Sequence, residues 1–290
     1  MPKRNVRGCV LYMKAIGPSE PGILRALTKD GGAVRWVQEG IVINSPVGIA
    51  VFAAIIASGW STAARAQDSG KGFFFGRPDA SLVIRGGLTV PSASSDVFAQ
   101  AIKDLTLDKG AFQAASIGAD LQIHGTDRYD VTLGFDFAGS NTKSEFRNWV
   151  DNLNHPIEQY TTLQRMPVTM AIKYYLVPNG RSIGRLAWVP TTFTPYVGLG
   201  GGWMWYQFRQ NGDFIDMTTK NVFHDDYKSD GWTPTAQAFA GVDYSVSPRY
   251  AITTEMRYTA ARATLSGDFT GFSRIDLSGL ATSIGIHVRF

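Results

Sequence analysis

From residue 79 to residue 290, apolar and polar residues alternate with a period of two rather than the 3.6 residues of a helix. Residues 129–138, YDVTLGFDFA, show the pattern most clearly, because every second residue from Tyr129 to Phe137 is apolar. Such alternation is typical of a β-strand with one apolar face and one polar face. We therefore expect this part of the chain to consist of β-strands.

Eight segments carry the alternation and predict eight strands. They lie near residues 79–90, 112–123, 129–138, 162–176, 194–208, 233–246, 250–260 and 274–290. A tilted strand needs only about 9–11 residues to cross a bilayer. The expected fold is therefore an all-β, eight-stranded antiparallel up-and-down transmembrane β-barrel over residues 79–290.

The connections between these segments differ in length. Short connections such as HGTDR at 124–128 and SPR at 247–249 alternate with much longer polar stretches. Four long external loops are then expected at one end of the barrel and shorter turns at the other, as in outer-membrane barrels. The connection at 177–193 falls at the end where short turns are expected, but it is longer than such a turn.

The chain ends on the strand IGIHVRF, whose apolar face carries Ile286, Val288 and Phe290. A free terminus normally frays. In hydrocarbon, however, every backbone N–H and C=O group must be hydrogen-bonded within the protein. We therefore expect the first and last strands to pair and to place Phe290 at the rim of a closed barrel.

The apolar face of the barrel is expected to point outward into lipid. Aromatic side chains favour membrane interfaces, and four are predicted to form an aromatic girdle: Trp203, Trp205, Tyr129 and Tyr174. A soluble lipocalin-like barrel is the alternative, and it would turn its apolar residues inward.

The polar face is then expected to point into the lumen. Eight strands enclose a space that side chains roughly fill, and buried charges need partners. Six charged residues are predicted to form a plug of ion pairs, or to gate a narrow pore: Arg85, Asp120, Lys173, Glu255, Arg257 and Arg289.

Residues 1–66 have the features of a signal segment, with a long basic region, an apolar run at 47–58 and the sequence Ala64-Arg65-Ala66. Cleavage is expected after Ala66, and residues 67–78 are predicted to be a linker. A buried core helix or an N-terminal membrane anchor is the alternative. Cleavage would remove Cys9, the only cysteine, and with it any disulfide or thiol chemistry.

The signal segment also carries most of the excess positive charge. It holds 8 of the 28 Lys and Arg residues and 3 of the 24 Asp and Glu residues. Residues 67–290 therefore carry 20 basic and 21 acidic residues, a formal net charge of −1. The sequence pI of about 9.1 is therefore no sign of nucleic-acid binding.

Candidate chemistry is sparse. His287 and Ser283 share a strand face but lie about 13 Å apart, too far for a nucleophile and its base. The acidic loop around His224 lacks the ligand spacing of a calcium site. We expect no catalytic residue, metal or cofactor, and no enzymatic activity.

Together, the signal segment, the eight alternating segments, PYVGLGGG at 195–202 and the terminal IGIHVRF resemble the small eight-stranded outer-membrane β-barrel family. The OmpA membrane domain, OmpW and opacity-type surface proteins belong to it. The resemblance covers about residues 79–290 and implies the outer membrane of a Gram-negative cell, reached through a cleaved signal peptide. It also implies contact with outer-membrane lipid and lipopolysaccharide, and that the barrel-assembly machinery reads Phe290, Val288 and Ile286. The long N-terminal extension departs from the family pattern.

The expected function is a mainly structural or surface role for a monomer with a polar plugged lumen and four long external loops. A narrow small-solute channel like OmpW-type porins is one alternative. An adhesion or surface-recognition protein is another, because eight aromatic residues fall in the predicted loops and could bind partners or pack on one another: Phe98, Phe146, Trp149, Tyr160, Phe214, Phe223, Tyr227 and Phe272. A lipid A-modifying enzyme is disfavoured by the separation of His287 from Ser283.

Overall fold

The computed structural model describes residues 73–290 except 152, 185, 217 and 218. The predicted signal segment, its cleavage site and residues 67–72 of the predicted linker lie outside the described residues. No helix among the described residues is long and apolar enough to cross a membrane.

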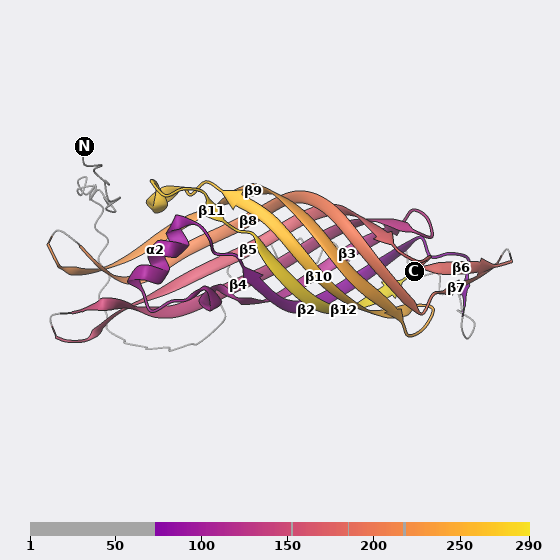
Figure 1. Cartoon of the computed structure of the whole chain (residues 1–290), viewed down its shortest axis with the longest axis horizontal. Coiled ribbons are helices and arrows are strands. Elements are labelled where there is room, and N and C mark those ends of the chain that lie inside the picture. Colours follow the sequence, from indigo (N-terminus) through magenta and orange to yellow (C-terminus); the bar gives the residue numbers. More distant parts are fainter. Residues whose placement is uncertain (1–72, 152, 185, 217–218) are drawn as a thin grey trace, which may run out of the picture. The chain divides into compact units, whose positions relative to one another are not determined.

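Eight long antiparallel strands form a closed ring (Figure 1). In chain order they are β2 (Ala80–Pro91), β3 (Ala114–His124), β4 (Tyr129–Val150), β5 (Pro156–Tyr175), β8 (Phe193–Ile215), β9 (Val222–Ser245), β10 (Tyr250–Ala263) and β12 (Gly279–Arg289). Each strand pairs with its neighbour in the chain, and β12 also pairs with β2. This up-and-down ring confirms the predicted fold class.

The last residue takes part in closing the ring. Phe290 donates its backbone N–H to the Ala80 carbonyl at 3.0 Å, and the Ala80 N–H is 3.2 Å from the Phe290 carbonyl. Within the two strands, Ile286 lies opposite Ile84, and Val288 lies opposite Leu82. The chain therefore ends as a bonded strand, as its alternation predicts.

The outer surface of the ring is apolar over a band of limited height. Outward side chains such as Leu133, Met170, Leu199 and Ile284 are between 47% and 70% exposed. On β4 the apolar outward face runs from Tyr129 to Phe137, and polar residues such as Lys143 follow. This stretch is about 26 Å of strand, or about 20 Å in height at a tilt of about 40°, near the apolar band of membrane barrels. The surface is that of a transmembrane β-barrel and excludes the soluble lipocalin-like alternative.

The two ends of the ring differ. We call the end with Ala80 and Phe290 the terminus end, and the opposite end, which carries α2 (Asp96–Asp104), the loop end (Figure 1). At the loop end, η1 (Lys109–Phe112) follows α2, and η2 (Gly267–Phe269) and β11 (Ile275–Asp276) lie between β10 and β12. The first long connection therefore contains a helix that the polar composition did not predict.

Two of the four predicted loops are largely continuations of strands. Residues 139–150 and 156–161 belong to β4 and β5, and residues 209–215 and 222–232 belong to β8 and β9. The register of β5 with β8 continues out to Gln159 opposite Gly212. The four strands thus extend past the apolar band, because backbone pairing continues in water after the outward residues become polar.

The terminus end carries a small separate sheet in the order β1 (Phe74–Phe75), β7 (Ala187–Pro190), β6 (Gly180–Ile183). Phe74 lies opposite Trp188 in this sheet. Residues 74 and 75, within the segment predicted to be a linker, therefore form a strand of this sheet, and the linker assignment stays a prediction. The long connection between β5 and β8 is the β6–β7 hairpin. The last barrel strand likewise begins at Gly279 and not near residue 274, because Ile275 and Asp276 pair with β10 as β11.

Gly198 on β8 shows how closely the lumen is packed. A β-carbon at this inward position would overlap the ring of Phe239, which is only 5% exposed. We expect Gly198→Val to lower the free energy of unfolding by about 1–3 kcal/mol through overpacking. Urea unfolding in lipid vesicles, followed by tryptophan fluorescence, measures the change. Gly86→Val is the control, because the nearest atom to a β-carbon at Gly86 is 3.9 Å away. Equal losses in both variants would contradict this packing.

Candidate functional site

The middle of the lumen holds a network of two arginines and three carboxylates. Arg85 forms ion pairs with Asp120 and with Asp136, the latter at 2.7 Å. Arg257 lies 2.8 Å from Glu255, 3.3 Å from Asp136 and 3.4 Å from Asp120. The five residues come from β2, β3, β4 and β10, so the network joins strands on different sides of the ring. Four of the five were predicted as lumen charges, and the fifth, Asp136, lies on the polar face of the predicted strand at 129–138.

Neutral groups complete the network. Gln237 accepts a hydrogen bond from Arg257 at 3.1 Å and donates one to Thr169 at 2.9 Å. The hydroxyl of Tyr196 donates to Glu255 at 3.1 Å. A β-carbon at Gly118 would collide with the Asp136 carboxylate, so glycine at this inward position makes room for the charge.

A second charged cluster lies toward the terminus end. Lys173 forms an ion pair with Asp243 at 2.8 Å, and both side chains are at most 2% exposed. The Lys173 ammonium also lies 3.7 Å from the centre of the Tyr196 ring, which favours a cation. His287 lies 3.5 Å from Asp243. One carboxylate therefore faces two basic side chains from different strands.

Asp130 forms a similar centre in the same layer. It accepts a hydrogen bond from the Tyr175 hydroxyl at 2.7 Å, and the His124 ring lies 2.9 Å away. Neither His124 nor His287 forms a hydrogen bond with a serine, threonine or cysteine in the described part of the chain. These contacts join β3, β4 and β5 across the inner wall of the barrel.

Arg289 and the small sheet cover the terminus end of the lumen. The Arg289 guanidinium lies 5.9 Å from the centre of the Trp188 ring and donates to the Ser245 hydroxyl at 2.9 Å. Trp188 is only 1% exposed, and a β-carbon at Gly180 would overlap its indole ring. The sequence placed Arg289 with the other lumen charges, but the structure places it apart from the Arg85–Arg257 network.

At the loop end the lumen is filled by apolar residues, a filling that the strand alternation did not predict. Phe98 on α2 is fully buried, with its ring 4.8 Å from that of Phe112 and 5.7 Å from that of Phe208. The Phe208 ring lies 5.1 Å from that of Phe269. The apolar spacing of Val97, Phe98 and Ala101 within the first loop was the available signal. We call this group, which includes Phe98, Phe112, Phe208 and Phe269, the apolar cap.

Backbone and charged contacts fix α2 and the following turn over the lumen. Thr106 donates its N–H to the Glu145 carbonyl at 2.8 Å, and Arg147 donates to the Leu107 carbonyl at 3.0 Å. The Asp96 carboxylate accepts the Ser273 N–H at 2.9 Å. Burial raises the pKa of Asp96, but hydrogen bonds from Ser273 and from the Val97 N–H together outweigh it, so this pKa lies below its usual value.

Strand β5 displays the order of these layers along the barrel. Its inward residues begin with Tyr175 and Lys173 at the terminus end, continue with Thr169 beside the central network, and reach Leu163 in the apolar cap.

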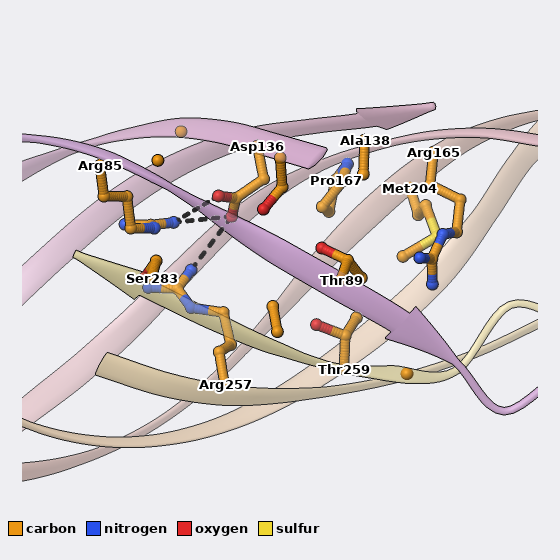
Figure 2. Close-up of a pocket in the computed structure, with 15 residues that line it drawn as sticks. Arg85, Thr89, Asp136, Ala138, Arg165, Pro167, Met204, Arg257, Thr259 and Ser283 are labelled. Atoms are coloured by element: carbon orange, nitrogen blue, oxygen red, sulfur yellow. Dashed lines mark hydrogen bonds and ion pairs between the residues drawn. The ribbon is translucent and has the colours of Figure 1, made fainter. Parts of the chain in front are cut away.

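Between the network and the cap lies a cavity of about 50 Å³ (Figure 2). It is lined by Arg85, Asp136, Arg165, Arg257 and neighbouring residues. The charged network and the cap thus fill most of the lumen on either side of this cavity.

The predicted girdle residues lie on the outer surface. Tyr129 and Tyr174 are direct cross-strand partners near the terminus end and are 48% and 41% exposed. Trp203 is 58% exposed, while Trp205 is half-buried beside its cross-strand partner Trp232. Their position suits an aromatic girdle, and that role stays a prediction.

No protein-family model and no curated protein matches the chain. Among solved structures, the chain is similar to the outer membrane protein OprG from Pseudomonas aeruginosa, with 17% identity over 75% of this chain and 99% of that chain and a TM-score of 0.40. It is similar to E. coli Outer Membrane Protein W, with 18% identity over 74% of this chain and 100% of that chain and a TM-score of 0.34. It is also similar to Ail, the attachment invasion locus protein of Yersinia pestis, with 12% identity, 74% and 100% coverage and a TM-score of 0.39. The closed strand pairing establishes the barrel independently of these weak similarities.

The Lys173–Asp243 pair provides a test of the charged filling. We expect Lys173→Met to lower the free energy of unfolding by about 3–5 kcal/mol, because Asp243 would lose its close cation while staying buried. The double variant Lys173→Met, Asp243→Asn should recover much of this loss. Urea unfolding in lipid vesicles measures all three proteins.

The exposed pair Lys143 and Glu158, 2.6 Å apart on the strand extensions, is the matched control. Lys143→Met should change stability little, because water screens this pair. If Lys173→Met lowered the free energy of unfolding no more than Lys143→Met does, the Lys173–Asp243 pair would contribute no more than an exposed ion pair, and the expectation would be wrong.

Proposed function

We propose that the protein is a monomeric outer-membrane barrel with a mainly structural and surface role and a closed lumen. The observation that carries this proposal is the filling of the lumen at three levels. Trp188 and Arg289 cover the terminus end, ion pairs cross the middle, and the apolar cap covers the loop end. An eight-stranded ring offers little further space.

The proposed orientation places the terminus end in the periplasm. The short β3–β4 and β9–β10 connections lie at this end, and the long strand extensions lie at the other, which matches the asymmetry of outer-membrane barrels. Export would occur through a signal peptide cleaved after Ala66. The barrel-assembly machinery would read Phe290, Val288 and Ile286, and outward charges beyond the apolar band, such as Lys143, would meet lipopolysaccharide.

Fractionation tests the proposed location. The protein is expected in the outer-membrane fraction and is expected to migrate differently on a gel when boiled and unboiled, because a closed barrel resists detergent until it is heated. N-terminal sequencing of the same sample should begin at Gln67. Recovery of the protein from the periplasm without detergent would contradict the proposal.

Planar-bilayer recording tests the closed lumen. Wild-type protein should show no discrete conductance steps. Glu255→Ala should show none either, because this change loosens Arg257 and Tyr196 while the apolar cap and Trp188 remain in place. Discrete steps in the wild type that change with Glu255→Ala would instead support the narrow small-solute channel, for which the cavity beside the central network is the favouring observation.

Adhesion or surface recognition is the second candidate function. The strand extensions end in exposed apolar residues, including Leu153 at 75% exposure and Trp149 at 36% exposure. The Lys220 ammonium lies 4.5 Å from the centre of the Trp149 ring, so the tips of two hairpins contact each other. Phe98 and Phe214, by contrast, are buried, so only some of the loop aromatics could meet a partner. No catalytic activity is part of the proposal.

A further inference from the structure

The two ends of the lumen cavity differ in how their charged side chains are paired. Arg85, Arg257 and Asp136 lie at one end of it, and Arg165 and Met204 lie at the other, with Thr89 and Thr259 between them (Figure 2). At the first end, the Asp136 carboxylate is neutralised by Arg85 at 2.7 Å and Arg257 at 3.3 Å. The charge at the second end has no such partner.

Arg165 is a buried cation without an ion pair in the described part of the chain. Its side chain is 4% exposed, and its hydrogen bond goes to the carbonyl oxygen of Leu277 at 3.0 Å. Asp276 acts on Arg165 from farther away, but its carboxylate accepts hydrogen bonds from Ser94 and Ser278. Burial of a guanidinium without a close counter-charge is unfavourable, so a neighbouring negative charge would stabilise it.

The cavity wall also carries hydroxyl groups that are available as hydrogen-bond donors. Thr89 and Thr259 line it between the charged network and Arg165 (Figure 2), and neither hydroxyl forms a hydrogen bond within the described part of the chain. Hydroxyl groups can rotate to donate to an anion. Together with Arg165, they supply donors to a cavity of about 50 Å³, which is larger than the roughly 10–15 Å³ needed to hold one water molecule.

We propose that this cavity binds a small monovalent anion of about the size of chloride. The Arg165 guanidinium supplies the charge, and the hydroxyls of Thr89 and Thr259 supply further donors. A cation is disfavoured, because the carboxylate at the cavity, Asp136, is already paired with two arginines. The bound anion would lie between the charged network and the apolar cap and would stabilise the protein where the two meet. This site is independent of whether the lumen conducts.

Bromide is the probe for a direct test. Crystals of the wild-type protein grown in sodium bromide should show an anomalous peak within contact distance of the Arg165 guanidinium. The same peak should be absent from crystals of Arg165→Met grown in the same salt. Bromide found only on the outer surface of the wild-type protein, or in the cavity of Arg165→Met as well, would overturn the proposal.

Thermal unfolding provides a second test that needs no crystals. At equal ionic strength, the unfolding midpoint of the wild type should be about 3–5 °C higher in sodium chloride than in sodium gluconate, whose anion is too large for the cavity. The matched control Arg209→Gln, which removes an exposed arginine paired with Asp226, should keep this difference. Thr259→Val, which keeps Arg165 and removes one donor, should reduce it. Equal midpoints of the wild type in the two salts would overturn the proposal.

Discussion

The structure depends on one constraint, which is that backbone N–H and C=O groups facing hydrocarbon must be hydrogen-bonded within the protein. A sheet satisfies this constraint only when it has no free edge, so β12 pairs with β2 and the chain ends as part of the wall. The closed ring then fixes the rest. Alternate residues must meet lipid, the other half must share a narrow interior, and the charges among them need partners inside that space.

The interior meets this requirement in two chemically different ways. In the middle and toward the terminus end, carboxylates and basic groups from different strands face one another, as in the Lys173–Asp243 pair and the Arg85–Arg257 network. At the loop end, aromatic and aliphatic side chains from α2 and the strand extensions pack like the core of a soluble protein. Where the two regions meet, neither kind of filling is complete, and the cavity beside Arg165 lies at that boundary.

The proposed surface role rests on the filled lumen and on the strand extensions at the loop end. The β4–β5 and β8–β9 hairpins continue as a four-stranded sheet past the apolar band, with register maintained from Tyr175 to Gln159 on β5. A paired sheet holds exposed side chains at fixed positions more firmly than a loose loop would. The exposed residues near Trp149 are therefore displayed on a regular support, which suits a surface role.

The sequence by itself determined the strand-forming segments, the inward and outward faces and the strand that closes the ring, because a period of two is a local property of the chain. It also identified the charged residues that meet in the lumen, including Arg85, Asp120 and Glu255. Only the tertiary structure decided which charges pair and that Arg289 lies beside Trp188, because these contacts depend on how strands far apart in the chain register around the ring. The helix α2, the strand extensions and the pairing of Phe74 with β7 also escaped prediction. Their residues carry weak or mixed patterns locally, and their structure depends on the barrel surfaces that they cover or continue.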